Sequence, residues 1–216
     1  MTLARSLILI PALVNAFALA AENPKVNNPQ NPATQWGQWR GPLGSGYAPH
    51  ANPPVEWSET KNIRWKTALP GLGHSSPIVW GDHVYLTTAV PQGEKLPVPE
   101  QPTGAHNNLD PFHKLHFTVL AINRRDGKIV WQRIVHTAQP HQSTHESATW
   151  ASNSPITDGK RVIASFGSSG LYCLDTKDGK LIWKKYLGNM RVKHGHGEGA
   201  SPVLHDNTVA INWDHE

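Results

Sequence analysis

The 216-residue sequence is short of the features that define several protein classes. It has one cysteine, Cys173, so it cannot form an internal disulfide framework. Cys173 stands between Tyr172 and Leu174 in an apolar run, which predicts a small buried side chain and not a nucleophile. Charged residues make up only 17%, the formal net charge is +4, and no run of Lys or Arg occurs. These absences exclude a disulfide-stapled fold and argue against a nucleic-acid partner.

The chain also lacks a long apolar run and, beyond its N-terminus, any helix-periodic stretch. Its most apolar segment, Ser6–Ala18, is shorter than the about 20 residues that span a bilayer. Arg5 before this segment and the Ala-Leu-Ala that ends at Ala20 predict a signal peptide over residues 1–20. We therefore expect an exported protein, periplasmic or extracellular, with no membrane span after cleavage. No cysteine lies near the cleavage site, so we do not expect a lipoprotein.

What the sequence does contain is turn chemistry at short intervals. The stretch Ser154–Trp183 has four apolar pieces that are separated by Asp158-Gly159, Gly167–Gly170 and Asp178-Gly179. Glycine accepts a positive φ without steric cost, so such breaks between β-branched and aromatic runs predict hairpins. We therefore predict a four-stranded antiparallel meander over this stretch.

The meander repeats along the chain. Upstream, Ser76–Leu86 matches its first half and Leu120–Trp131 matches its second half, with an insertion roughly between Val90 and Phe117. Downstream, Ser201–Ile211 opens a third copy. The spacing of the copies fits the four-stranded blades of propeller repeats.

A family signature ends each complete copy. Leu174–Trp183 has the form Leu-Asp-x-x-x-Gly-Lys-x-x-Trp, and the first copy has Asn123 in place of the Asp. This motif resembles the tryptophan-docking motif of PQQ-like β-propeller proteins, and the resemblance extends from about Trp36 to Glu216. In that family one tryptophan per blade packs between neighbouring blades. The equivalent structural residues of this chain are Trp65, Trp131 and Trp183.

The repeats and the resemblance together predict an all-β fold, a partial β-propeller of four-stranded antiparallel blades. We expect two complete blades, one orphan closing strand at Asn62–Gly71 and the start of a third blade, as the N-terminal fragment of a longer protein. The predicted domains are the signal peptide at 1–20, a flexible leader and irregular aromatic, Gly/Pro-rich segment at 21–61, and incomplete propeller repeats at 62–216.

Meander geometry sorts the connections into two rims. With strands lettered A to D from the axis outward, the A–B and C–D turns share one rim, which we call the turn rim; these turns are too short to form a site. The B–C and D–A connections share the other, the loop rim, with the long segments 91–116, 136–153 and 188–200. Long loops on a rigid scaffold usually carry binding, so we expect the functional face here. Ten of the 13 histidines lie on or beside this rim: His74, His106, His113, His116, His136, His141, His145, His194, His196 and His215.

Two histidine clusters on the loop rim are candidate transition-metal sites. Imidazole nitrogens and carboxylates bind zinc, copper, nickel and non-haem iron, and glycine on both sides of His196 would let the backbone bend inward. No familiar spacing such as H-E-x-x-H occurs, so hydrogen bonds from these side chains to loop backbone are the alternative. The candidate metal ligands are His141, His145, His194, His196, Glu198, Asp214 and His215.

Three functions are compatible with these features. The first is an exported scaffold without catalysis or cofactor of its own, which contacts envelope proteins or a small-molecule ligand at the loop rim. The resemblance implies it, because many PQQ-like propellers lack the cofactor and one is a scaffold in outer-membrane β-barrel assembly. The second is a quinoprotein alcohol or sugar dehydrogenase that uses PQQ and Ca²⁺. The third is a metal-dependent enzyme at the His-rich rim.

Two absences argue against the quinoprotein hypothesis. The alcohol-oxidising members of the family carry a disulfide between adjacent cysteines, and this sequence has no Cys-Cys pair. The loop rim is also richer in histidine than in the carboxylates and amides that Ca²⁺ prefers. We therefore favour the scaffold, with the other two functions kept as alternatives.

Overall fold

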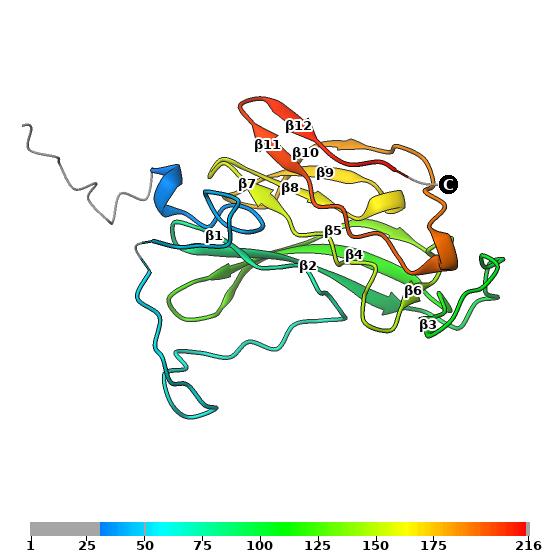
Figure 1. Ribbon diagram of the computed structural model, residues 1–216, viewed down its shortest axis with the longest axis horizontal. Coiled ribbons are helices and arrows are strands. Elements are labelled where there is room, and N and C mark those ends of the chain that lie inside the picture. Colours follow the sequence, from blue (N-terminus) through cyan, green and yellow to red (C-terminus); the bar gives the residue numbers. More distant parts are fainter. Residues whose placement is uncertain (1–30, 50, 215–216) are drawn as a thin grey trace, which may run out of the picture.

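Each predicted meander is a four-stranded antiparallel sheet in the computed structural model, which describes residues 31–49 and 51–214 (Figure 1). The first sheet has the order β1-β2-β4-β5, formed by β1 (Ile78–Trp80), β2 (His83–Gln92), β4 (Lys114–Asn123) and β5 (Ile129–Ala138). The second has the order β7-β8-β9-β10, formed by β7 (Ile156–Thr157), β8 (Arg161–Ser165), β9 (Leu171–Asp175) and β10 (Leu181–Lys185). The prediction of an all-β partial propeller is confirmed.

Two short pairs of strands complete the described structure. β11 (Val203–His205) and β12 (Thr208–Ala210) form the hairpin that begins the third blade. β3 (Asn108–Leu109) pairs with β6 (Thr144–His145) between two loops. The helical elements of the described residues are the 3-10 turns η1 (Pro32–Thr34), η2 (Gly167–Ser169) and η3 (Lys193–Gly195). Within residues 31–49 and 51–214, no helix has the length and apolar character to cross a membrane. The predicted signal peptide, residues 1–20, and His215 lie outside the described residues.

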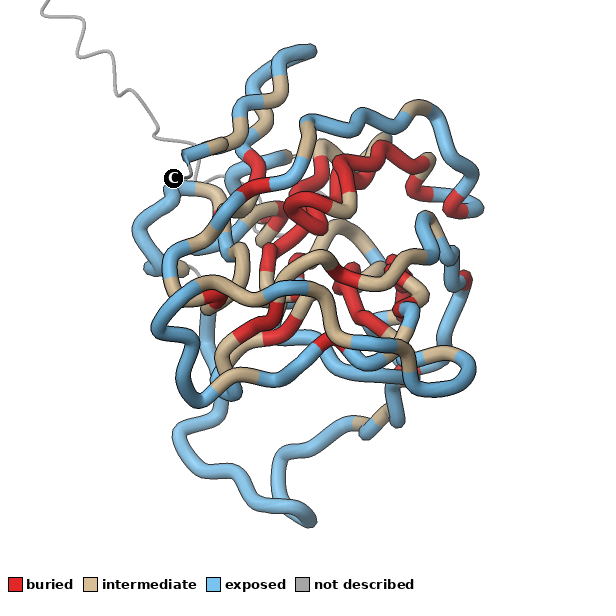
Figure 2. Tube along the Cα trace, turned by 90° about the vertical axis from the view of Figure 1, so that its right-hand side faces the viewer, coloured by how far each residue is buried: buried red, intermediate tan, exposed pale blue. Residues whose placement is uncertain are grey.

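The hydrophobic core lies between successive sheets. On β8 and β9, Val162, Ala164, Tyr172 and Leu174 pack toward the first blade, in one cluster with Phe117 and other residues of that blade. The alternate residues Ile163, Leu171 and Cys173 pack with Leu204 and Val209 of the third blade. Both faces of these central strands are therefore buried, which explains why their sequences are apolar without polar alternation. Figure 2 shows the buried segments gathered inside and the long loops exposed around them.

Cys173 belongs to this buried set and is fully inaccessible, as predicted. Burial raises the pKa of its thiol to about 11, with a smaller lowering by Arg161. A thiol with so high a pKa is almost entirely protonated at neutral pH, and the thiolate is the reactive form. Cys173 is thus a packing residue.

The C–D turns are built to receive a tryptophan. In the second blade, Asp175 accepts hydrogen bonds from the backbone of Lys177 and Gly179, and its own N–H donates to the carbonyl of Lys180. Asn123 makes the same three bonds in the first blade, because its side-chain oxygen accepts as the carboxylate does. The Asn-for-Asp change in the motif therefore preserves the turn.

Each of these turns contains a glycine that lies against a tryptophan ring from earlier in the chain. Gly127 and Gly179 have φ values of +75° and +69°, and a Cβ on either would lie 2.6 Å from a ring atom of Trp65 or Trp131. The Trp65 indole N–H donates to the Arg124 carbonyl at 2.9 Å, and that of Trp131 to the Thr176 carbonyl at 3.0 Å. Trp183 packs against the cluster between the second and third blades. Contacts of this kind are suited to hold blades together, and the blade-locking role of the three tryptophans stays a prediction.

The expected closing strand, Asn62–Gly71, is extended but forms no ladder with another strand of the described residues. It lies on the first blade through Trp65, which packs with Leu86, Leu120 and Ile122, and through the Thr67 hydroxyl, which donates to the Gly127 carbonyl at 2.6 Å. The segment thus occupies the place of an outer strand from a preceding blade. The other strands of such a blade, with which this segment would pair, are not found among the described residues.

Residues 35–37, where the predicted leader passes into the irregular aromatic segment, pack against both blades. The backbone of Trp36 bridges to Val79 of β1, and the Thr157 N–H donates to the Gly37 carbonyl. Gln35 is buried and accepts a hydrogen bond from the Gly81 N–H. The segment therefore crosses the inner strands of both blades, because those strands have unpaired backbone groups on their axial side.

Two sequence-based expectations about the rims are wrong in detail. β2 and β4 stay paired up to Gln92 and Lys114, so the insertion is shorter than predicted and His116 lies on a strand, as does His136 on β5. The turn rim also has room for a ligand: a cavity of about 630 Å³ is lined by Leu43, Trp80, Lys160 and Leu204, among others. The turns themselves are short, but the N-terminal segment crosses this rim and walls the cavity.

Replacing Trp131 should destabilise the chain strongly. Its side chain is buried between the first and second blades, and loss of a large buried aromatic residue costs about 3–5 kcal/mol. Trp131→Phe keeps most of the packing and loses the bond to Thr176, so it should cost much less than Trp131→Ala. Chemical denaturation of the full chain measures both. Trp57→Ala, at a 69% exposed position, is the control and should leave the midpoint nearly unchanged.

Asp158 should make the second blade sensitive to acid. Burial by itself would raise the pKa of this carboxyl, but hydrogen bonds from Arg161 and Lys160 and the charge of Arg161 lower it overall. A carboxyl whose folded pKa is depressed stabilises the fold at neutral pH, and this stabilisation is lost as the pH falls through the folded pKa. Asp158→Asn should therefore be less stable than wild type at pH 7 and equal to it in strong acid.

Thermal unfolding across pH values measures this difference. The matched control is Asp82→Asn in the corresponding turn of the first blade, where the ion pair with Arg125 is more exposed and contributes little. A gap between wild type and Asp158→Asn that persists in strong acid would contradict the assignment.

Candidate functional site

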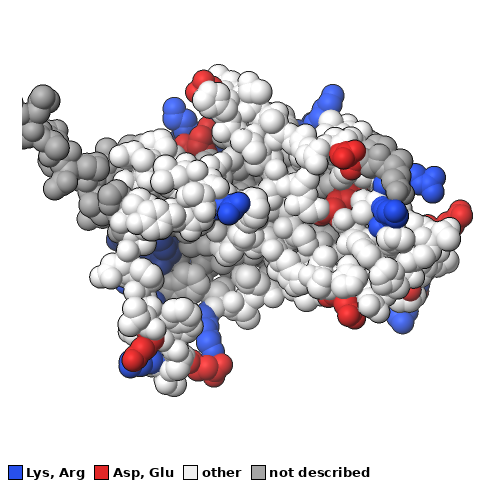
Figure 3. Space-filling view, viewed as in Figure 1, with Lys and Arg blue, Asp and Glu red and all other residues white. Residues whose placement is uncertain are grey.

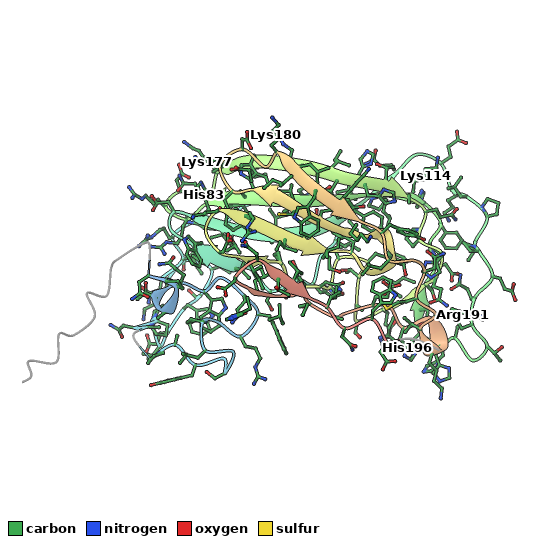
Figure 4. The ribbon with its side chains drawn as sticks, turned by 90° about the horizontal axis from the view of Figure 1, so that it is seen from above. His83, Lys114, Lys177, Lys180, Arg191 and His196 are labelled. Atoms are coloured by element: carbon green, nitrogen blue, oxygen red, sulfur yellow. The ribbon has the colours of Figure 1, made fainter. Side chains whose placement is uncertain are left out.

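The long connections meet at one end of the molecule. Asn108 and Leu109, in the insertion of the first blade, pair with His145 and Thr144 in the connection to the second blade. The backbone N–H of His145 in turn donates to the carbonyl of His196, in the connection to the third blade. Figure 4 shows His196 and Arg191 at this end, whereas His83, Lys177 and Lys180 lie at the other. The predicted convergence of these loops on one rim is confirmed.

Asn108 joins the three connections. Its side-chain nitrogen lies 2.8 Å from the Ser143 hydroxyl, 2.8 Å from the His194 carbonyl and 3.2 Å from the Gly195 carbonyl. The Ser143 hydroxyl also donates to the Gly195 carbonyl at 3.0 Å. One polar side chain thus fixes the backbone of the third connection against the first two.

Four histidine rings gather beside this junction. The ring centroids of His106 and His196 are 4.8 Å apart, those of His106 and His194 5.7 Å, and those of His194 and His196 5.5 Å. The ring of His145 lies 5.1 Å from that of His196. We call these four residues, His106, His145, His194 and His196, the histidine cluster.

The backbone on both sides of His196 adopts conformations that favour glycine. Gly195 and Gly197 have φ values of +62° and +94°, and a Cβ on them would lie 2.5 Å from the Ser143 hydroxyl and 2.3 Å from the Thr144 hydroxyl. His194 itself has a φ of +59°, which is strained for a residue with a side chain. The two glycines therefore allow the loop to press onto β6 and turn both histidines into the same cluster.

The histidine cluster is polar and incompletely satisfied. Nδ1 of His194 and Nε2 of His196 are buried without a hydrogen-bond partner. Burial of the ring lowers the pKa of His196, and charges on His106, His145 and His194 would lower it further. His106 Nδ1 donates to the Gly104 carbonyl at 2.8 Å, and His145 Nδ1 contacts the Ser147 hydroxyl at 2.7 Å.

The other predicted metal ligands lie apart from this cluster. His141 Nε2 donates to the Met190 carbonyl at 2.8 Å. The Glu198 carboxylate accepts hydrogen bonds from the backbone N–H and the hydroxyl of Ser168. Asp214 is exposed, and His215 lies outside the described residues. Of the predicted set, the structure brings together His145, His194 and His196 only.

As they stand, the described residues include no group of three or more His, Cys, Asp or Glu side chains that could hold a metal ion. The oxygen ligands that Ca²⁺ requires are also poorly placed on the loop rim, where Glu198 is engaged by Ser168 and Asp214 is exposed. These residues do not fit the Ca²⁺ of a PQQ site. Figure 3 shows charges of both signs scattered over the visible face, with no basic patch.

Sequence reasoning placed His106 on the loop rim but left it out of the metal set, and it did not single out Asn108. Neither residue has a local signal, because the insertion carries no repeat motif. Their positions depend on the register of β3 with β6, which joins segments more than thirty residues apart.

Comparison with known proteins places the chain among repeat proteins. Residues 54–212 match the family model described as outer membrane protein assembly factor BamB. A comparison with curated proteins gives no match. Among solved structures, a europium-containing methanol dehydrogenase matches with 15% identity and a TM-score of 0.28, over 57% of this chain. The chain spans 26% of the length of that enzyme.

Removing the Asn108 side chain should loosen the loop rim. Asn108→Ala leaves the His194 carbonyl without the donation from Asn108, whereas the Gly195 carbonyl keeps the Ser143 hydroxyl, and a buried unpaired group costs about 1–3 kcal/mol. We expect faster amide hydrogen exchange at 194–197, with the core strands unchanged. Asn189→Ala removes an exposed bond to Tyr186 in the same connection and serves as the control. Equal exchange in both variants would show that Asn108 does not hold the loops.

Proposed function

Because the chain belongs to the PQQ-like repeat family whose model is described as outer membrane protein assembly factor BamB, we propose that it is an exported binding or assembly scaffold. Its partner contacts the loop rim. The family description points to an envelope protein, in particular one engaged in outer-membrane protein assembly, as the class of partner. The predicted signal peptide supports export to the periplasm or beyond.

The observation that carries this proposal is the hydrogen-bonded junction between the long connections. The pairing of β3 with β6 and the bonds of Asn108 join the insertion of the first blade and the two connections between blades into one surface. A surface that is ordered before binding loses less conformational entropy when a partner arrives. A loop rim built in this way is suited to recognition of a folded or extended polypeptide.

The side chains on the insertion suit a protein partner. Leu109 and Phe112 are each 38% exposed, and the ammonium group of Lys95 lies 4.8 Å from the centre of the Phe112 ring. Aromatic residues are enriched in protein interfaces, and Phe112 is a partly exposed aromatic residue of the insertion. We place these residues at the edge of the binding surface.

Site-directed photocrosslinking in the producing cell tests the proposal. A photoreactive residue replaces Lys95 on the loop rim in one variant and Lys177 on the turn rim in the other. Both side chains are exposed and neither is part of the core. We expect envelope-protein adducts from position 95 in the periplasmic fraction and few from position 177.

Three results would count against the proposal. Equal labelling from both rims would remove the loop rim as the specific surface. Recovery of the chain only from the cytoplasm would contradict export. Ca²⁺-dependent PQQ uptake with dye-linked oxidation of an alcohol or sugar would replace the scaffold by the quinoprotein alternative.

A further inference from the structure

The histidine cluster has a feature that packing alone does not explain. Two of its ring nitrogens, Nδ1 of His194 and Nε2 of His196, are buried and lack any hydrogen-bond partner. A buried polar atom without a partner costs free energy, and it calls for an unseen ligand, water or ion. The two rings are neighbours, with centroids 5.5 Å apart, so one ligand between them is a candidate partner for both atoms.

The ring of His106 has a nitrogen whose lone pair is available to a metal ion. Nδ1 of His106 donates to the Gly104 carbonyl, which leaves the lone pair on Nε2. A metal-binding histidine almost always donates its other ring N–H to a carbonyl or carboxylate in this way. His145 differs, because its Nδ1 accepts a hydrogen bond from the Ser147 N–H and its Nε2 therefore carries the proton.

The spacing of the three ring centres is close to the spacing that one transition-metal ion requires. Zinc lies about 2.0–2.1 Å from an imidazole nitrogen, so two imidazoles on one tetrahedral ion have ring centres about 5 Å apart. The three centroid distances among His106, His194 and His196 are 4.8, 5.5 and 5.7 Å. Imidazole donors favour zinc, copper and nickel over calcium or magnesium.

We propose that His106, His194 and His196 bind one divalent transition-metal ion, with a fourth position open to water or a ligand. The described side chains are not set as a ready metal site as they stand, so binding requires their rings to rearrange. His106 is the ring that is free to move, because it is exposed and lies on the insertion. The other two are held in place through the backbone by Asn108 and β6.

The backbone of the insertion allows His106 to approach His194 closely. A Cβ on Gly104, which has a φ of +79°, would lie 3.0 Å from Nδ1 of His194. Only glycine therefore lets the insertion bring His106 so close to His194. The site would also tie the insertion to the connection between the second and third blades.

Titration with Zn²⁺ and Co²⁺ tests the site directly. The full chain is purified without a histidine tag, stripped with a chelator and titrated with Zn²⁺ by calorimetry. We expect one ion per chain, and His196→Ala and His106→Gln should each weaken binding by at least about 10-fold. Bound Co²⁺ should show the visible absorption of a tetrahedral site, which both variants lose.

The matched control is His113→Ala. His113 is a partly exposed histidine of the same insertion, and its Nδ1 contacts the Gly93 carbonyl as His106 contacts Gly104. It should bind Zn²⁺ as wild type does. His106→Gln changes an exposed side chain, so it tests the site even if His196→Ala fails to fold. Absence of stoichiometric uptake, or equal losses in His113→Ala, would overturn the inference.

This inference does not depend on a partner at the loop rim. Crosslinking from position 95 can fail while Zn²⁺ binds, and Zn²⁺ binding can fail while crosslinks form, so each proposal is tested separately.

Discussion

At two of the contacts between successive segments, a tryptophan ring lies against a glycine of the next blade, and this contact constrains the turn on which it lies. Trp65 covers Gly127 and Trp131 covers Gly179, and each indole N–H donates to a carbonyl of the turn that it covers. The positive φ of each glycine makes the turn, and the missing Cβ makes room for the ring. One residue therefore shapes the hairpin and the contact between blades, and the motif has little freedom to vary at this position.

This contact also decides where variation is tolerated. The C–D turns must be short and uniform, because a tryptophan packs onto them, and the A–B turns lie at the same end. Insertions are accommodated at the opposite end, where the connections run free of the docking contacts. The loop rim gathers the long segments for this reason, and they can then pair with each other, as β3 does with β6.

The short turns alone would leave no room for a ligand on the turn rim, but the N-terminal segment adds a wall and so forms a cavity there. Gln35–Gly37 hydrogen-bonds to both blades through Gly81, Val79 and Thr157. It crosses the axial edge of the inner strands and lines one side of an open cavity of about 630 Å³. Backbone groups left unpaired on that edge favour any extended segment that reaches them.

The sequence by itself determined the strands, the blade repeat and the two rims, because these follow from local turn chemistry and from periodic spacing. The burial of Cys173 and the turn role of Asn123 were local in the same sense. Only the tertiary structure decided which histidines meet: His106, His145, His194 and His196 come together, whereas His141 and Glu198 bond to neighbouring loop residues. Such meetings depend on the pairing of loops far apart in the chain, and the two-residue ladder of β3 with β6 is too short to leave a periodic pattern in the sequence.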